Sequence, residues 1–450
     1  MAEPHSSALA SDAAERPDLA LEGGVARLVR PPVFLHAGWR TAGTFLWSRF
    51  RALDGILGYY EPLHESLAAV SASTLARHGP LLWASGHPRL QRSYFDEFAP
   101  LFRKSAPGVR AYRREFATDD FFAGPDAAMP ALEGYVRLLL ERARAGNQQP
   151  VLKFCRSLGR AGWMTKSFPE AVHVAVMRDP VSQFISAKHQ FVAHDNPYFL
   201  LMPLRVLARN ASQARVAAAL RHFAVRLPPG AEDDNPERAN SVLGAHLRRS
   251  EPEAWYRGFL VFWLLGALGI PETIDAIIDA NLLSLSPAYR AECKAELAVL
   301  SGVAVDLGGG ASEACCTGRV ADRLGCTQAE LWRHHATAAS FLAAEVAPDW
   351  ANRFAPACVG TMLTYGTLLG MDPGHPIHAG ALARGGEWEA LAAYAERAAA
   401  DGRRAQRRAE RAERELAGVH RSRSWKVTSP LRLLGGRLRQ AALMIGAKKS

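Results

Sequence analysis

Residues Pro31 to Leu46 read Pro-Pro-Val-Phe-Leu-His-Ala-Gly-Trp-Arg-Thr-Ala-Gly-Thr-Phe-Leu. A short apolar run leads into a loop of small residues. Apolar residues at three-to-four spacing then predict a helix that ends near Leu57. Proteins of the α/β class build anion sites in this order, because backbone N–H groups and the positive end of the helix point at the ligand. The stretch therefore predicts an α/β fold with an anion site in the loop.

The loop itself carries suitable side chains for an anion. Arg40 adds a full positive charge, and Thr41 and Thr44 add hydroxyl donors. The small residues Ala42 and Gly43 allow the backbone to approach a ligand closely. We expect these five residues to bind phosphate.

The loop differs from that of nucleoside triphosphatases. Gly38 and Gly43 match the two glycines of G-x-x-x-x-G-K-[ST]. Thr44 then stands in the place of the lysine, and Phe45 in the place of the hydroxyl that binds magnesium. The pattern favours a phosphate-containing donor that needs no magnesium clamp, and we expect no metal.

A second stretch, Ala171 to Ser186, reads Ala-Val-His-Val-Ala-Val-Met-Arg-Asp-Pro-Val-Ser-Gln-Phe-Ile-Ser. Three alternating valines predict a buried strand, with Arg178 at its carboxyl end, where open α/β sheets bind ligands. Pro180 suits the first turn of a helix, and Ser186 then lies two turns into it.

Together, the two stretches resemble the sulfotransferases that use 3′-phosphoadenosine 5′-phosphosulfate (PAPS). The first is similar to that family's 5′-phosphosulfate loop, K-[ST]-x-G-T or R-S-G-T. The second is similar to its 3′-phosphate signature, an arginine after a strand, then Asp-Pro, with a serine eight residues after the arginine. Many relatives have lysine where Arg40 stands, and arginine occurs in the carbohydrate-modifying branch. The resemblance covers roughly residues 30 to 320.

The resemblance implies a P-loop-like central parallel sheet flanked by helices, with PAPS as co-substrate. It implies that Arg40 and residues Thr41 to Phe45 hold the 5′-phosphosulfate. It assigns the 3′-phosphate to Arg178 and Ser186, and it implies transfer of the sulfuryl group to a hydroxyl of a carbohydrate or glycan.

A candidate for the catalytic base follows the first helix, in the segment Gly58 to Glu65. An alcohol becomes a good nucleophile only as its proton leaves. A Tyr-Glu-Pro segment at this place resembles one in carbohydrate sulfotransferases, where a glutamate commonly serves as base, which points to Glu61. Because Glu61 precedes a proline, we expect it to be extended, with its side chain free to enter a cleft. His64 is the alternative base. Otherwise Glu61 caps the next helix and His64 is a solvated neighbour.

Three further segments have patterns that predict their roles less closely. Pro150 to Arg156 reads as a strand ending in Lys153 and Arg156, which either hold an anionic donor or acceptor or form a salt bridge at the sheet end. Asn196 to Ser250 is predicted to be irregular, as a lid or acceptor-binding insertion. Gly258 to Ile270 is too short an apolar run to cross a bilayer and is predicted to be a buried helix.

The net charge of +10 is concentrated at the carboxyl end of the chain. Residues 401–450 hold fourteen Lys or Arg against four Asp or Glu, which equals the whole excess. Within this tail, Ser422 to Arg432 resembles a C-terminal signature, Ser-x-Ser-Trp-[RK]-x-Thr-x-Pro-Leu-Arg, of bacterial glycosyltransferases that make cell-surface polysaccharides. Leucines, Trp425 and flanking arginines suit an anionic membrane surface, with docking to a polysaccharide-synthesis protein as the alternative. The tail lacks nucleic-acid motifs, so no nucleic acid is expected.

The six cysteines show no zinc spacing, and the first 24 residues show no signal peptide, so we expect a cytoplasmic protein, peripheral on the inner face of the cell membrane if the tail binds lipid. We predict a leader at 1–28 that is disordered, a sulfotransferase domain at 29–372, a helical extension at 373–418 and a basic amphipathic tail at 419–450. The alternatives are a kinase with a degenerate phosphate loop and a non-catalytic scaffold in polysaccharide assembly.

Overall fold

The computed structural model describes residues 30–78, 92–271, 273–285, 287–308 and 324–345. The leader, the helical extension and the basic tail predicted from the sequence lie outside these residues, and so does the last part of the predicted catalytic domain.

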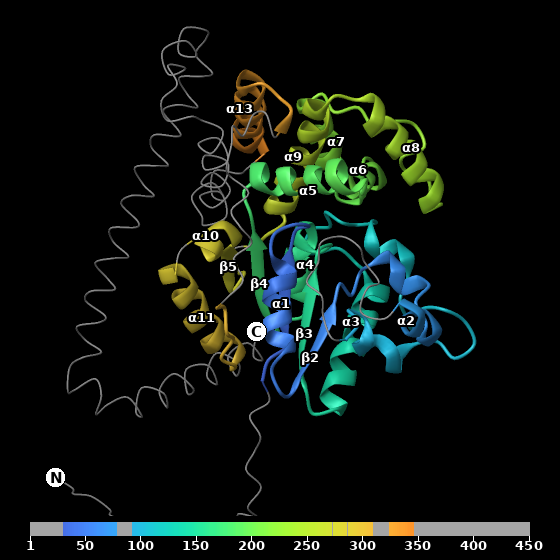
Figure 1. Cartoon of the computed structure of the whole chain (residues 1–450), viewed down its shortest axis with the longest axis vertical. Coiled ribbons are helices and arrows are strands. Elements are labelled where there is room, and N and C mark those ends of the chain that lie inside the picture. Colours follow the sequence, from blue (N-terminus) through green and yellow to red (C-terminus); the bar gives the residue numbers. More distant parts are fainter. Residues whose placement is uncertain (1–29, 79–91, 272, 286, 309–323, 346–450) are drawn as a thin grey trace, which may run out of the picture.

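A parallel sheet of five strands lies at the centre of the fold, in the order β2-β3-β1-β4-β5 (Figure 1). The strands are β1 (Val33–Ala37), β2 (Ile56–Tyr60), β3 (Gln149–Phe154), β4 (Val172–Met177) and β5 (Ala276–Asp279). Every residue of β1, β3 and β4 is buried, as expected for a parallel sheet that helices cover on both faces. The predicted α/β class with a central parallel sheet is confirmed.

The strand order places a ligand-binding crevice at one point of the sheet. From β1 the chain passes through α1 (Gly43–Arg51) to β2 on one side, and from β4 it leaves through α5 (Pro180–His194) and reaches β5 on the other side. Since β1 and β4 are neighbours, their connections diverge at their carboxyl ends. Open α/β sheets bind ligands at such a switch point.

The other helices cover the sheet and extend beyond its carboxyl edge. They are α2 (Ala72–His78), α3 (Pro130–Ala145), α4 (Ala161–Ser167), α6 (Tyr198–Arg209), α7 (Ala214–His222), α8 (Pro236–Arg249), α9 (Pro252–Leu268), α10 (Ala280–Leu285), α11 (Pro287–Ser301) and α13 (Gln328–Glu345), with short 3-10 helices η1 (Glu65–Ala68), η3 (Asp96–Leu101), η4 (Arg114–Ala117) and η5 (Leu158–Arg160). In Figure 1, α5 to α9 and α13 gather at one end of the sheet, and α10 and α11 lie beside β5.

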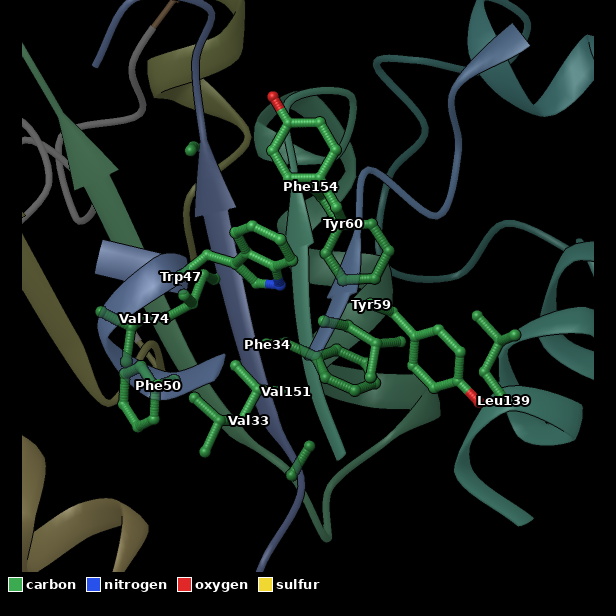
Figure 2. Close-up of a cluster of buried hydrophobic side chains, with 14 of the residues drawn as sticks. Val33, Phe34, Trp47, Phe50, Tyr59, Tyr60, Leu139, Val151, Phe154 and Val174 are labelled. Carbon is green, nitrogen blue, oxygen red and sulfur yellow. The ribbon is translucent and has the colours of Figure 1, made fainter. Parts of the chain in front are cut away.

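Two hydrophobic cores result from this arrangement. The first lies around the sheet and contains aromatic side chains from several strands and from α1 (Figure 2). There Trp47 packs edge-on against Tyr60 at 4.9 Å, and Phe34 against Phe154 at 5.6 Å between ring centroids. The second core joins α5, α6 and α9 beyond the carboxyl edge. The site described below lies between the two cores.

The predicted end of the first helix near Leu57 is wrong. The helix ends at Arg51, and Ile56 and Leu57 belong to β2. Gly55 has a φ of +75°, a left-handed conformation that glycine adopts without strain, and it lies directly before the first residue of β2. The apolar spacing continued from the helix into the strand and hid this boundary.

The segment Asn196 to Ser250 is also more regular than predicted. It contains α6, α7 and α8, and the Pro-rich residues 227–235 form the loop that precedes α8. Pro203 lies inside α6, a position that usually disfavours a helix. The apolar run from Gly258 to Ile270 falls mostly within buried helix α9, as predicted. No helix among the described residues is long and apolar enough to span a bilayer.

Candidate functional site

The loop between β1 and α1 has an unusual backbone. Arg40 and Ala42 adopt left-handed conformations, with φ of 66° and 61°. Each such residue other than glycine costs on the order of 1–3 kcal/mol, so the surrounding structure must hold the loop in place. Turns of this kind can gather backbone N–H groups into a concave anion site. The anion site expected from the sequence in this loop stays a prediction.

Two glycines let this loop pack tightly. A Cβ atom on Gly43 would lie 2.6 Å from the Cβ of Ala37, and one on Gly38 would lie 2.8 Å from Nε2 of Gln183. Contacts this short do not occur between real side chains, so larger residues would displace the loop. Gln183, from α5, also donates from Nε2 to the carbonyl of Trp39 at 2.6 Å. The two motifs are therefore locked together through backbone and side chain.

The second motif has the predicted geometry. Pro180 opens α5, and the carboxylate of Asp179 caps the helix by accepting from the N–H of Ser182 at 2.8 Å. Arg178 lies between β4 and this cap, half-buried, and donates to the carbonyl of Arg40 at 3.3 Å. The strand, the cap and the helix thus hold Arg178 beside the first loop.

The two motifs meet directly through their side chains. Nε of Arg40 donates to Oγ of Ser186 at 2.9 Å, and the Arg40 guanidinium lies 5.2 Å from the ring centroid of Phe199 in α6. Arg40, Arg178 and Ser186 form one group, which we call the donor-side cluster. Arg40, which we expected at the 5′-phosphosulfate, thus contacts Ser186, which we expected at the 3′-phosphate.

The remaining loop residues are placed differently. The buried Thr41 hydroxyl donates to the carbonyl of Gly38 at 2.9 Å, so it closes the loop. The Thr44 hydroxyl lies 3.2 Å from the Tyr60 hydroxyl of β2. Phe45 is half-buried at the start of α1, and the Arg49 guanidinium lies 4.9 Å from its ring centroid. Thr44 therefore ties the loop to the segment that carries the candidate bases.

The prediction that Glu61 is extended is wrong. Its φ is 48°, and its side chain is 3% exposed instead of free in a cleft. Its carboxylate accepts from the Lys153 ammonium, from the backbone N–H of Cys155 at 2.9 Å and from the Arg156 guanidinium at 3.1 Å. These tertiary contacts override the local preference that the following proline imposes.

The ion pairs set the protonation state of this carboxylate. Burial alone would raise the pKa of Glu61, but the charges of Lys153 and Arg156 outweigh burial and lower it to about 2. Burial would lower the pKa of Lys153, yet interactions with Cys155 and Glu61 raise it overall. Glu61 is thus a carboxylate, and Lys153 a cation, across the physiological range.

His64 is buried, so the view of it as a solvated neighbour is wrong. Its Nδ1 accepts from the N–H of Ser66 at 3.0 Å, and its Nε2 lies 3.2 Å from the hydroxyl of Tyr198. Because Nδ1 accepts a hydrogen bond, the neutral ring carries its proton on Nε2. Burial is the main reason that the pKa of His64 falls to about 3, so the ring is neutral at pH 7.

Glu65 and Tyr198, which the sequence analysis did not identify as site residues, join Glu61 and His64 in one hydrogen-bonded network. The Tyr198 hydroxyl donates to Glu65 at 2.8 Å, and Arg156 donates to the other Glu65 oxygen at 2.5 Å and to the Tyr198 hydroxyl. Burial would raise the pKa of Glu65, but Arg156 and His64 lower it to about 2. The members of this buried network, which we call the acid–base network, are Glu61, His64, Glu65, Lys153, Arg156 and Tyr198.

The acid–base network lies against the anion loop. The Lys153 ammonium lies 4.6 Å from the ring centroid of Tyr60, and the Arg156 guanidinium lies 5.3 Å from that of Trp39. The thiol of Cys155 donates to the Gly38 carbonyl at 3.4 Å. A group bound in the loop would thus have an anion site on one side and a set of proton donors and acceptors on the other. Of the two sequence readings for Lys153 and Arg156, the structure shows the salt bridge at the sheet end.

The described residues contain no group of three or more His, Cys, Asp or Glu side chains that could hold a metal ion. The expectation that the protein uses no metal stays a prediction.

Comparison with known proteins adds one structural similarity. The sequence matches no protein-family model and no curated protein. A crystal structure of a sulfotransferase from Alicyclobacillus acidocaldarius aligns with 70% of this chain and 94% of its own chain, at 16% sequence identity and a TM-score of 0.30. A similarity at this level is too low to establish a family or a function.

Proposed function

We propose that this protein is a sulfotransferase that moves a sulfuryl group from PAPS to a hydroxyl of a carbohydrate or glycan. The observation that supports this most strongly is the hydrogen bond between Arg40 and Ser186, at 2.9 Å, which unites the two phosphate-binding motifs. They meet at the switch point of the sheet, where ligands bind in this class of fold.

The residues of the two motifs fit a sulfuryl donor that has two anionic groups. Arg40 and the backbone N–H groups of Thr41 to Phe45 bind the 5′-phosphosulfate, and Arg178 and Ser186 bind the 3′-phosphate. Hydrogen-bond donors that the protein holds in place before the reaction stabilise the charge that develops on the bridging oxygen of PAPS. This effect is worth several kcal/mol in comparable sites. PAPS supplies the sulfuryl group; the protein supplies binding, orientation and a proton acceptor.

Glu61 and His64 both remain candidates for that acceptor. Glu61 is ionised and already accepts three hydrogen bonds, whereas His64 is neutral and is joined to Glu65 through Tyr198. Removal of a general base typically lowers turnover about 10²–10⁴-fold. Turnover of Glu61→Gln and His64→Asn, each checked for folding by circular dichroism, identifies the base: the variant with the larger loss marks it, and two unchanged rates exclude both.

We also propose that the basic tail brings the enzyme to its acceptor at an anionic membrane. Each Lys or Arg near such a leaflet contributes about 1 kcal/mol, and salt weakens the attraction. The full chain should sediment with anionic vesicles at low salt, and a chain ending at Leu416 should not. Sedimentation of the shortened chain would instead favour a membrane contact elsewhere.

The overall proposal is tested by mass analysis of surface glycans from cells with and without this protein. Loss of sulfate esters in its absence is expected. Loss of phosphate esters would instead indicate a kinase, and unchanged glycans that still require the protein for assembly would indicate a scaffold.

A further inference from the structure

Arg205 is a buried cation in an otherwise apolar part of α6. It lies between Leu204 and Val206 and is only 5% exposed. Its Nε is buried without a hydrogen-bond partner, and no hydrogen bond or ion pair engages its guanidinium within the part of the chain that the structure describes. Burying a guanidinium without a partner is costly, so such a group points to a missing anion.

The nearby acids already bind other side chains. Glu65 and Asp119 are carboxylates whose charges act on Arg205. Glu65 accepts from Arg156 at 2.5 Å and from Tyr198 at 2.8 Å, while Asp119 accepts from Arg209 at 2.8 and 2.5 Å.

Two further arginines make this region more positive. The charges of Arg209 and Arg114 both act on Arg205 and oppose its own charge. Arg114 is exposed at the start of η4, while Arg205 is almost fully buried. The local field thus favours an anion that comes from outside the chain.

The position of Arg205 on α6 assigns it to one side of the site. Arg205 follows Tyr198 by seven residues, which is two turns on the same helix face and about 10 Å along the axis. Phe199, which packs under Arg40 of the donor-side cluster, is rotated about 100° from that face. Arg205 therefore shares the face of the acid–base network and not that of the donor-side cluster.

We propose that Arg205 binds an anionic group of the acceptor, so that the acceptor is an acidic glycan carrying a carboxylate, a phosphate ester or a sulfate ester. This inference rests on the proposed function. The acceptor hydroxyl lies at the acid–base network, and the anionic group lies about 10 Å from it, roughly two helix turns along α6. Arg205 by itself accounts for a preference for anionic over neutral acceptors, and no exposed lysine or arginine outside this face is required.

The first test measures thermal unfolding of the full chain without ligand. Arg205→Met replaces the unpaired guanidinium with an apolar side chain of similar length. Arg215→Met, at an exposed position of α7, is the matched control for loss of one charge. The midpoint of Arg205→Met should equal or exceed that of the control. A midpoint clearly below that of the control would mean that other groups of the protein already stabilise the Arg205 guanidinium, which overturns the proposal.

The second test measures binding by calorimetry with saturating 3′-phosphoadenosine 5′-phosphate present. The probes are an oligogalacturonate and its methyl ester, and a sulfated and a phosphorylated oligosaccharide each beside its neutral parent. At least one anionic probe should bind roughly ten- to a hundredfold tighter than its neutral partner, as expected for a charge-assisted hydrogen bond. Arg205→Met should lose this preference and Arg215→Met should keep it.

The pattern of results separates this inference from the proposed function. The absence of a preference for all three anionic probes, or a preference that survives in Arg205→Met, overturns the role of Arg205 while donor binding stays intact. Failure of the nucleotide to bind would count against the sulfotransferase, and the preference measured without nucleotide would still decide the role of Arg205.

Discussion

The donor-side cluster and the acid–base network lie on opposite sides of one loop, yet they handle charge differently. In the cluster, half-buried Arg40 and Arg178 donate to neutral acceptors, the Ser186 hydroxyl and a backbone carbonyl. In the network, two buried cations, Lys153 and Arg156, balance two glutamates through direct contacts. These two hydrogen bonds of the cluster go to neutral groups, whereas the network balances its own charges through ion pairs.

This difference separates binding from stability. Exchanging a hydrogen bond to a neutral acceptor for one to a bound anion costs the protein little. A buried ion pair cannot lose one partner without leaving the other charge in a medium of low dielectric constant. Substitutions in the two regions should therefore affect different measurements.

The largest effect is expected from Lys153→Met. This change leaves the carboxylate of Glu61 buried with only part of its ion pairs, which typically costs about 3–5 kcal/mol of unfolding free energy. Arg178→Met is the comparison and should cost less, about 0.5–1.5 kcal/mol, because Arg178 is half-buried and this hydrogen bond goes to a backbone carbonyl. Urea unfolding of both variants measures the contrast. Equal losses in the two variants would remove the distinction between the regions.

The next effect concerns donor affinity in the cluster. Arg178→Ala should weaken binding of 3′-phosphoadenosine 5′-phosphate by about 1.5–3 kcal/mol, or roughly ten- to a hundredfold, because a charge-assisted hydrogen bond is lost. Binding of adenosine 5′-phosphosulfate, which has no 3′-phosphate, should scarcely change. Calorimetry with both nucleotides measures this, and an equal loss for the two would contradict the role of Arg178.

A third region is a chain of hydrogen bonds that links β1 and β4 within the sheet. Ser157 Oγ lies 2.7 Å from Nδ1 of His36, whose Nε2 lies 3.0 Å from Nδ1 of His173, and Nε2 of His173 lies 3.0 Å from the carbonyl of Phe168. Since that carbonyl can only accept, His173 donates from Nε2; when both rings are neutral, His36 then donates to His173 and Ser157 donates to His36. The chain of bonds is complete with both rings neutral.

This chain predicts acid sensitivity. Burial, followed by the charge of His173, holds the pKa of His36 well below its ordinary value, and burial lowers that of His173. Below pH 6.5 the unfolded chain therefore binds more protons than the folded one, and stability falls as pH falls. Each such histidine contributes about 1.4 kcal/mol per pH unit.

His36→Gln provides the measurement. Between pH 6.5 and 5, the slope of unfolding free energy against pH should be smaller in His36→Gln by about 1 kcal/mol per unit on average, rising toward about 1.4 at the acid end. Glu61 and Glu65, whose pKa values are lowered to about 2, lose their contribution only below the unfolded value near 4.5, outside this range. An unchanged slope would show that His36 titrates normally in the folded protein.

The features that the sequence predicted are mostly local ones. A strand followed by small residues and a helix, or by Arg-Asp-Pro, specifies its own geometry, so β1, β4 and the start of α5 were found from the chain alone. The position of Arg178 at the carboxyl end of a strand, and of Ser186 two turns into the next helix, followed from the local pattern.

The missed features depend on contacts distant in sequence. Tyr198 and Arg205 lie in α6, which Pro197 and Pro203 made look irregular. A single arginine within an apolar run was the available signal for Arg205. Glu61 departs from the extended form because its partners, Lys153 in β3 and Arg156 just after it, lie 92 and 95 residues along the chain. No local pattern contains that information.

The most direct measurement of the central claim is nucleotide selectivity of the unmodified full chain in the presence of EDTA. The Arg178 and Ser186 arrangement predicts that 3′-phosphoadenosine 5′-phosphate binds at least tenfold tighter than adenosine 5′-diphosphate, by about 1.4 kcal/mol or more, and that EDTA leaves its affinity unchanged. Equal affinities for the two nucleotides, or tight binding of ATP that depends on magnesium, would contradict the assignment of the site to a sulfuryl donor.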